Sequence, residues 1–216
     1  MKYYPLALDI KGRACVVAGG GAVAERKVLS LISAGASVTV VSPALTGTLR
    51  ALTAEGRISW LERAVAESDL EKAFLVIAAT DDGAVNERMA QLCRDRGILV
   101  NVVTSPAASS FLVPSVVEQG DLLIAISTSG NSPALARKVR ERLEQEFGPE
   151  YAALLEELAR LRKELMAEVG DERVRRKVLE SVVDSDVLAL LKKGEAKAAG
   201  KRIREIVARE TGYGAR

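Results

Sequence analysis

Three glycines and an alanine near the N-terminus have the spacing of a dinucleotide-binding loop. The pattern G-x-G-x-x-G/A is fitted by the run Gly19-Gly20-Gly21-Ala22-Val23-Ala24. The first glycine allows a tight turn, the second lets the backbone approach a pyrophosphate, and the third small residue lets a helix pack close to its strand. Backbone N–H groups at the start of that helix can bind phosphates without a cationic side chain. By itself, the pattern also fits a glycine-rich turn in another kind of α/β protein.

The elements on both sides of the loop favour the dinucleotide interpretation. An apolar run of strand length, residues 14–18, precedes the glycines, and apolar residues recur at helical spacing from Val23 to Ser33. Residues 37–41 then predict a second buried strand, which completes a βαβ unit of the required length. The acid that usually binds the adenosine ribose should follow this strand, but Ser42-Pro43 stands there. These residues therefore leave both NAD and NADP open.

Polar residues follow two later predicted strands. The strand predicted over residues 73–79 ends at Thr80-Asp81, and the strand predicted over residues 97–103 ends at Thr104. In an open parallel sheet, ligands lie beyond the carboxyl ends of the strands, so we expect Thr80 and Asp81 beside the cofactor. Asp81 and Asp82 can also cap the helix predicted from Val85, and the two roles are compatible.

The alternation of strands and helices through residue 104 predicts an α/β fold. Its first part is a Rossmann-like, doubly wound parallel sheet with the glycine loop at its edge crevice. A helix over residues 46–55, a short strand over 58–61 and a helical turn from Glu67 complete this part. Two β-rich runs follow, residues 111–117 and 122–127, and they predict an antiparallel hairpin. Because exposed apolar strands are sticky, we expect the hairpin to pair with a second copy in a homodimer.

The remainder of the chain predicts helices. Ser132 is the expected N-cap, with Pro133 at the first position, of a helix that runs to about Phe147. Further helices are expected over residues 150–169, 172–181 and 196–210, and Asp184-Ser185-Asp186 predicts a helix start rather than a metal pair. We therefore divide the chain into an NAD-binding domain (1–113), a dimerisation region (114–148) and a small helical domain (149–216).

Composition excludes several classes of function. A net charge of +2 over 216 residues gives no reason to expect nucleic-acid binding. No long apolar segment or signal peptide is present, so we expect a cytoplasmic protein without a membrane partner. The absence of histidine excludes a histidine base, a Ser-His triad and imidazole metal sites. Cys15 and Cys93 are expected to be reduced, buried thiols.

Several spaced motifs carry a family likeness, and they occur in the order Gly19-Gly20-Gly21-x-Val23-Ala24-Glu25-Arg26-Lys27, Ala78-Ala79-Thr80-Asp81-Asp82 with Val85-Asn86, Asn101-Val102-Val103, Phe111-x-x-Pro114-Ser115, and Ser127-Thr128-x-Gly130-x-Ser132-Pro133-x-Leu135-Ala136-Arg137. The chain resembles the precorrin-2 dehydrogenase family, which includes the N-terminal module of bacterial siroheme synthase. The resemblance implies NAD-dependent oxidation of precorrin-2 to sirohydrochlorin by a homodimer. Some relatives also insert ferrous iron.

The resemblance and the motifs together give an expected set of site residues. The resemblance implies that Ala22, Val23, Pro43 and Ala44 line the NAD site. The full set expected to bind the cofactor is Gly19, Gly20, Gly21, Ala22, Val23, Ala24, Ser42, Pro43, Ala44, Thr80, Asp81 and Asn101. The carboxylates of the tetrapyrrole need donors, and these are expected from Ser127, Thr128, Gly130, Asn131, Ser132 and Arg137. For Arg137, an ordinary surface position on a helix is the alternative.

Thr104 is the candidate catalytic position, and there the chain departs from the family. Relatives commonly have an aspartate at this position, with an assigned role in both reactions. A threonine hydroxyl forms hydrogen bonds but is neither a carboxylate base nor an iron ligand at neutral pH. Dehydrogenation can survive this change because the cofactor does the chemistry, whereas metal insertion is the weaker expectation. The alternative function is a nucleotide- or tetrapyrrole-binding protein without catalysis.

Overall fold

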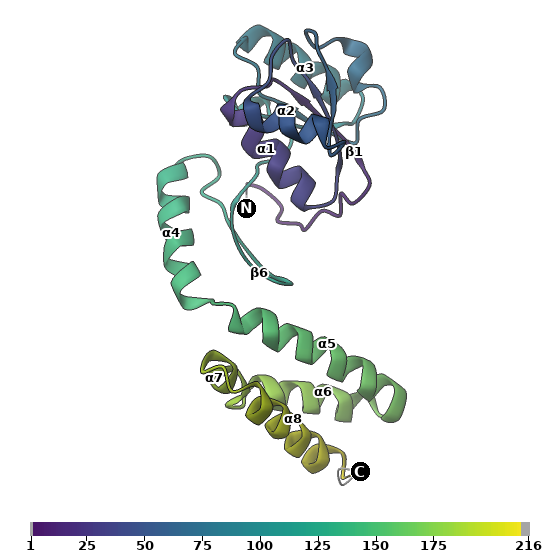
Figure 1. Cartoon of the computed structure of the whole chain (residues 1–216), viewed down its shortest axis with the longest axis vertical. Coiled ribbons are helices and arrows are strands. Elements are labelled where there is room, and N and C mark those ends of the chain that lie inside the picture. The colour runs from purple at the N-terminus through teal and green to yellow at the C-terminus, as the bar shows by residue number, and fades with distance from the viewer. Residues whose placement is uncertain (1, 213–216) are drawn as a thin grey trace. The chain divides into compact units, whose positions relative to one another are not determined.

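The structure is a computed structural model that describes residues 2–212. The chain forms two compact units, and the boundary between them lies between Val113 and Pro114 (Figure 1). Each unit has its own hydrophobic core. None of the helices in the described part of the chain is both long and apolar enough to cross a membrane.

The first unit is built on a five-stranded parallel sheet. Its strands, in the spatial order β3-β2-β1-β4-β5, are β1 (Ala14–Ala18), β2 (Ser37–Val41), β3 (Ser59–Leu61), β4 (Leu75–Ala78) and β5 (Leu99–Val102). The last residue of β1, Ala18, pairs with Val41 and with Ala78, and Ala78 pairs with Val102. The carboxyl ends of four strands are therefore level. The direction of winding reverses between β1 and β4, which places the ligand crevice of such a sheet beside the central strand.

Helices cover both faces of this sheet. Alternate residues of each strand point to opposite faces, and because both faces are buried the strands are continuous apolar runs. On one face, Val17 and Ile77 pack with the helices α1 (Ala22–Ser33) and α2 (Gly47–Ala54). On the other, Val16 and Val76 pack with α3 (Gly83–Asp95) and the 3-10 turn η1 (Glu67–Leu70). A fully buried aliphatic side chain contributes roughly 1.5–3 kcal/mol, so these layers hold the crevice rigidly.

Serine hydroxyls accept hydrogen bonds from backbone N–H groups of the edge strand β5. The N–H of Val100 donates to Oγ of Ser110 (2.8 Å), and the N–H of Val102 donates to Oγ of Ser109 (2.9 Å). Both serines follow the 3-10 turn η2 (Pro106–Ala108). Backbone donors that an edge strand normally exposes are therefore satisfied within the unit.

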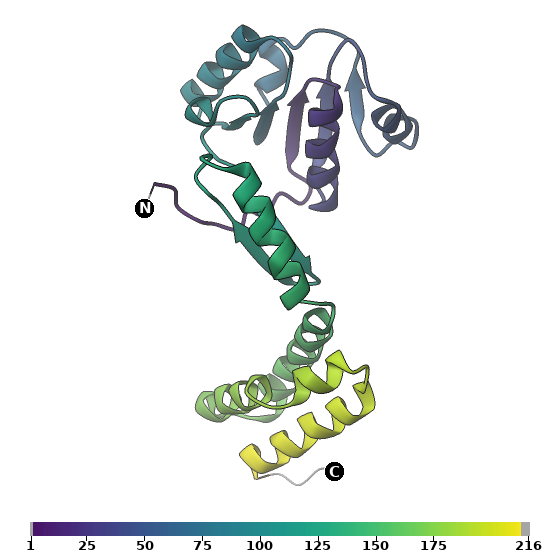
Figure 2. The ribbon, with the colours of Figure 1, turned by 90° about the vertical axis from the view of Figure 1, so that its left-hand side faces the viewer.

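The described part of the second unit, residues 114–212, contains a hairpin and five helices. The strands β6 (Ser115–Gln119) and β7 (Leu122–Ile126) pair antiparallel, and α4 (Pro133–Glu146) lies along them (Figure 2). The remaining helices are α5 (Glu150–Glu168), α6 (Glu172–Val183), α7 (Val187–Lys192) and α8 (Ala196–Thr211). Their shared core includes Leu161, Val178 and Ile206.

The expected fold class is confirmed, with a difference in the hairpin. Its first strand begins at Ser115 rather than at Phe111, because Phe111 packs against the core of the first unit. The helix start expected at residues 184–186 is confirmed, because Asp186 is the N-cap of the short helix α7 and also forms an ion pair with Arg202 (2.9 Å). Among residues 2–212 no three potential metal ligands cluster. The division of the chain at residue 148 stays a prediction.

Candidate dinucleotide-binding site

The carboxyl edge of the sheet brings together residues from four separate segments. Gly19 follows β1, Ser42 follows β2, Thr80 lies just beyond β4 and Thr104 just beyond β5. The Gly19 N–H donates to the Val41 carbonyl (3.0 Å), which joins the first two segments directly. The residues expected in this part of the site are therefore neighbours in the fold, although up to 85 positions separate them in the sequence.

Two of the glycines are required by the packing of the protein itself. Gly19 has φ +117°, and a Cβ built on it would lie 2.3 Å from the carbonyl oxygen of Ala79. A Cβ on Gly20 would lie 1.9 Å from the carbonyl oxygen of Ala44. Real Cβ atoms do not approach backbone this closely, so β4 and the loop after β2 close tightly around the glycine turn.

Gly21 differs, because nothing in the protein requires a glycine there. Its φ of −84° and ψ of −175° suit any residue, and a Cβ built on it would meet no atom within 4 Å. Gly21 is the N-cap of α1, and no side chain among residues 2–212 forms a capping hydrogen bond with that helix. The N–H groups of its first turn are therefore without a side-chain partner there, and such groups at a helix start can bind a phosphate. These residues fit a dinucleotide diphosphate.

The residues that follow Gly21 support the same arrangement. Ala24 is fully buried, so its small side chain allows α1 to pack against the sheet. Ala22 and Val23 are exposed at the start of α1, as are Pro43 and Ala44 in the loop after β2. Exposed apolar side chains at these positions are available to line a bound coenzyme.

A buried asparagine holds the corner after β4. Asn86, on α3, is 1% exposed, and its Oδ1 accepts hydrogen bonds from the Thr80 N–H (3.2 Å) and the Thr80 hydroxyl (2.8 Å). Its Nδ2 donates to the Thr80 carbonyl (3.0 Å). The side-chain amide therefore fixes the backbone of Thr80 on both sides. The sequence motifs contained Asn86, but no role was expected for it.

Replacing Asn86 by alanine should loosen this corner. Loss of these hydrogen bonds leaves the partly buried N–H and carbonyl of Thr80 without their asparagine partner, which costs about 1–3 kcal/mol, whereas the Thr80 hydroxyl can still donate to the Asp82 carbonyl (3.0 Å). We expect Asn86→Ala to lower the melting temperature by several degrees and to weaken NAD binding, as followed by calorimetry. Glu87→Ala, at the next and exposed position of α3, is the control. Unchanged stability and affinity in Asn86→Ala would contradict the assigned role.

The two aspartates after Thr80 have different surroundings. Oδ1 of Asp82 accepts from the N–H groups of Ala84 (2.8 Å) and Val85 (3.2 Å), so Asp82 caps α3. Asp81 is exposed and forms no hydrogen bond with another residue in the range 2–212. Capping therefore belongs to Asp82, and Asp81 remains the candidate for a coenzyme hydroxyl.

Ser42 and Asn101 fasten the backbone around the crevice. Ser42 is buried, and its carbonyl accepts from Nε1 of Trp60 (2.9 Å). Asn101 is also buried, and its Nδ2 donates to the Phe111 carbonyl (3.1 Å). The Ser42 carbonyl and the Asn101 side chain thus have partners within the protein, and a direct contact with the cofactor stays a prediction for both residues.

Thr104 lies in an exposed turn after β5. Its hydroxyl forms no hydrogen bond within the described part of the chain, whereas Oγ of the adjacent Ser105 accepts from the Ala108 N–H (3.3 Å). The position is therefore accessible to a substrate. Its catalytic role stays a prediction.

The residues expected to bind substrate form a separate group in the second unit. The Thr128 hydroxyl accepts from the Ser132 N–H (3.1 Å), and Oγ of Ser132 accepts from the Leu135 N–H (3.2 Å) and caps α4. Oγ of Ser127 accepts from the Ser129 N–H (3.1 Å). These hydroxyls shape the turn before α4. Gly130 forms part of this turn with φ +84°.

Asn131 and Arg137 of this group have exposed side chains without a role in the turn. Asn131 points into solvent, and the side chain of Arg137 is 70% exposed, with its Nε 4.0 Å from Glu141. At that distance, an ion pair between two exposed side chains holds Arg137 only weakly. Arg137 is thus available to a carboxylate, and its role in substrate binding stays a prediction.

Neither cysteine can serve as a nucleophile near neutral pH. Cys15 and Cys93 are free and buried, as expected. Burial raises the pKa of the Cys15 thiol and raises that of Cys93 to about 11. Both thiols are therefore protonated under ordinary conditions.

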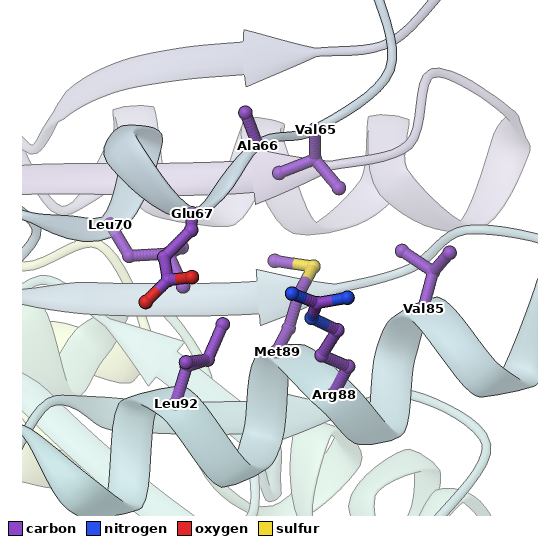
Figure 3. A pocket seen from close by; sticks show the side chains of 8 residues that line it. All are labelled: Val65, Ala66, Glu67, Leu70, Val85, Arg88, Met89 and Leu92. Carbon is purple, nitrogen blue, oxygen red and sulfur yellow. The ribbon is translucent and has the colours of Figure 1, made fainter.

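The cavities of the first unit lie away from the glycine loop. A groove of about 300 Å³ lies between η1 and α3, with Val85, Arg88, Met89 and Leu92 on one wall and Val65, Ala66, Glu67 and Leu70 on the other (Figure 3). A second hollow, of about 660 Å³, is lined by residues of α3 and the η2 turn. Neither contains an expected site residue.

Comparison with known proteins agrees with this geometry. Residues 6–115 match the family described as "Putative NAD(P)-binding", and residues 119–146 match the family described as "Sirohaem biosynthesis protein central". A siroheme synthase of Thioalkalivibrio sulfidiphilus is 39% identical over 216 residues, which are all of this chain and 44% of that protein. A siroheme synthase of Nitrosococcus oceani is 37% identical over 92% of this chain and 42% of its own length. The chain thus spans less than half of these relatives.

A solved structure extends the likeness to the fold. The structure described as SirC, precorrin-2 dehydrogenase, aligns with a TM-score of 0.79 and 27% sequence identity. The alignment covers 94% of this chain and 100% of that one. The likeness therefore includes both compact units.

Proposed function

Because this chain belongs to the precorrin-2 dehydrogenase and siroheme synthase family, we propose that it oxidises precorrin-2 to sirohydrochlorin with NAD. One observation carries the proposal. The open backbone cradle at Gly21 lies at the switch point of a sheet, in a chain that matches a precorrin-2 dehydrogenase over the whole of that solved chain. The cradle supports the coenzyme, and the likeness supports the substrate.

The chain's own residues would bind and orient the reactants. When bound, NAD accepts a hydride, and this is the difficult step. The amides of the first turn of α1 would hold the diphosphate, and the Thr80 corner would support the coenzyme beside the neighbouring strand. Asn131 and Arg137 would bind acidic groups of the tetrapyrrole. The proton that leaves with the hydride can pass to water or to a substrate carboxylate, so no side-chain base is required.

We also propose that the protein is a homodimer. Val117 is buried on one face of the hairpin, which α4 covers, whereas the opposite face carries Leu123, 55% exposed, and Ala125. A second copy would cover that apolar face. The expected cytoplasmic location remains a prediction.

A turnover assay tests the proposal. The purified chain is mixed with precorrin-2 and NAD, and the absorbance spectrum is followed. We expect NAD-dependent formation of sirohydrochlorin. Binding of NAD or tetrapyrrole without turnover would favour the alternative, a binding protein without catalysis, which the missing aspartate at Thr104 motivates.

Thr104 should separate the two reactions of the family. We expect the chain to dehydrogenate precorrin-2 but to insert ferrous iron slowly, because a threonine cannot take a pyrrole proton. Thr104→Asp should raise the rate of iron insertion by about 10²-fold, the typical effect of a general base. Formation of siroheme is measured by its absorbance. Thr104→Asn, similar in size to aspartate but uncharged, is the control, and equal rates in the two variants would refute the assignment.

A further inference from the structure

Glu25, on α1, places a carboxylate beside the loop that follows β2. In this type of fold, a carboxylate in that region usually comes from the end of the second strand. In coenzyme-binding sheets of this type, an acid at the end of the second strand faces the adenosine ribose. This chain has Ser42 there. Glu25, in the first turn of α1, instead accepts a hydrogen bond from the hydroxyl of Thr46. Its carboxylate is thereby fixed against the loop that follows β2.

Thr46 ties this carboxylate to the glycine loop and to α2. The Thr46 N–H donates to the Gly20 carbonyl (3.0 Å), and Oγ1 of Thr46 accepts from the Leu49 N–H (3.3 Å) as the N-cap of α2. The carboxylate of Glu25 therefore lies beside the N-terminus of α2 as well as in the first turn of α1. A helix N-terminus favours an anion, and here Glu25 already supplies it.

A phosphate on the adenosine ribose would meet this carboxylate. The loop from Ser42 to Thr46 contains no cationic side chain. Arg26 and Arg50 are exposed nearby in sequence, on α1 and α2, and neither forms an ion pair within residues 2–212. The carboxylate of Glu25 would repel a 2′-phosphate in this region. Without that charge, the N-terminus of α2 would attract the phosphate.

We propose that Glu25 selects NAD over NADP in this protein, taking the part that an acid at the end of β2 has elsewhere. The inference rests on the proposed function, since it assumes that the dinucleotide binds at the glycine loop. Thr46 is the residue that positions Glu25. Its side-chain hydroxyl would orient the carboxylate without touching the coenzyme.

The test measures binding of NAD and NADP directly, without substrate. Trp60 is the single tryptophan, and its indole N–H donates to the Ser42 carbonyl in the same loop, so its fluorescence reports on this region. Calorimetry gives the second readout. We expect the wild type to bind NAD at least tenfold more tightly than NADP. Glu25→Gln should bind NADP about tenfold more tightly than the wild type and NAD within threefold. The glutamine carbonyl can still accept from Thr46, so the fold should be retained.

Two further variants isolate the charge. Glu25→Asp keeps it and should keep the preference for NAD, whereas Glu55→Gln removes an acid at the opposite end of α2 and should change neither affinity. Equal NADP affinity in wild type and Glu25→Gln overturns the inference and leaves the proposed function intact. Equal binding of NAD and NADP by the wild type would also overturn the inference and leave the proposed function intact. A folded wild type that binds neither overturns the coenzyme assignment, and the inference with it.

Discussion

Gly19→Ala is expected to destabilise the first unit by about 3 kcal/mol or more and to abolish NAD binding. Two costs combine at this position. A φ of +117° is strained for any residue with a side chain, at about 1–3 kcal/mol. The added Cβ would also lie 2.3 Å from the Ala79 carbonyl oxygen and 2.7 Å from its carbon, so backbone must move. Thermal unfolding, followed by circular dichroism, should show a melting temperature lower by about 10 °C.

Gly12→Ala separates the two costs. Gly12 also has a positive φ, +69°, but a Cβ there would meet nothing within 4 Å. The variant should therefore lose only about 1 kcal/mol and should still bind NAD. If Gly19→Ala were no less stable than Gly12→Ala, the close approach of β4 to the glycine loop would be wrong.

The glycine loop could be predicted from sequence because its signals are local. An apolar run followed by glycines and a helical pattern marks strand, turn and helix within about 20 residues. The level carboxyl ends then follow from the general topology of such sheets, and Thr80 could be placed at the crevice before its contacts were known. The fold class and the arrangement of these residues at the carboxyl edge of the sheet are for these reasons the predictable part.

The contacts that hold the site could not be predicted, because they join distant segments. Nothing local reveals that the Ala44 carbonyl closes over Gly20, or that Thr46 holds Glu25 from 21 positions away. Asn86 was visible as part of a motif, yet its pairing with the Thr80 backbone depends on how α3 lies against β4. Side-chain hydrogen bonds of this kind depend on tertiary packing rather than on spacing.

Local patterns also left alternatives that only geometry could separate. Asp81 and Asp82 are equivalent in sequence as caps for α3, and the helix start at Gly83 assigns the cap to Asp82. The apolar residue Phe111 fits a strand equally well by pattern. It packs against the core of the first unit instead, and the Asn101 amide donates a hydrogen bond to its carbonyl, so the hairpin begins later.

Gly21→Ala should weaken NAD binding strongly without affecting the fold. The protein leaves open space around this position, and its backbone conformation suits alanine, so we expect a melting temperature within about 2 °C of the wild type. The added methyl group would occupy the space in which a diphosphate meets the first turn of α1. Overpacking of about 1–3 kcal/mol corresponds to a rise in the dissociation constant of up to about 100-fold. Calorimetric titration with NAD measures it.

Comparing Gly21→Ala with a second Gly→Ala variant tests whether the loss of affinity comes from contact with NAD. Gly200→Ala, within α8, is the control, because it adds a methyl group at a position with no role in the crevice and should favour the helix slightly. A ligand that binds elsewhere would leave the NAD affinity of Gly21→Ala and Gly200→Ala equal, and the proposed diphosphate site would then be wrong. A glycine that the protein does not need, at a helix start that no side chain caps, is explained if a phosphate completes that end of α1.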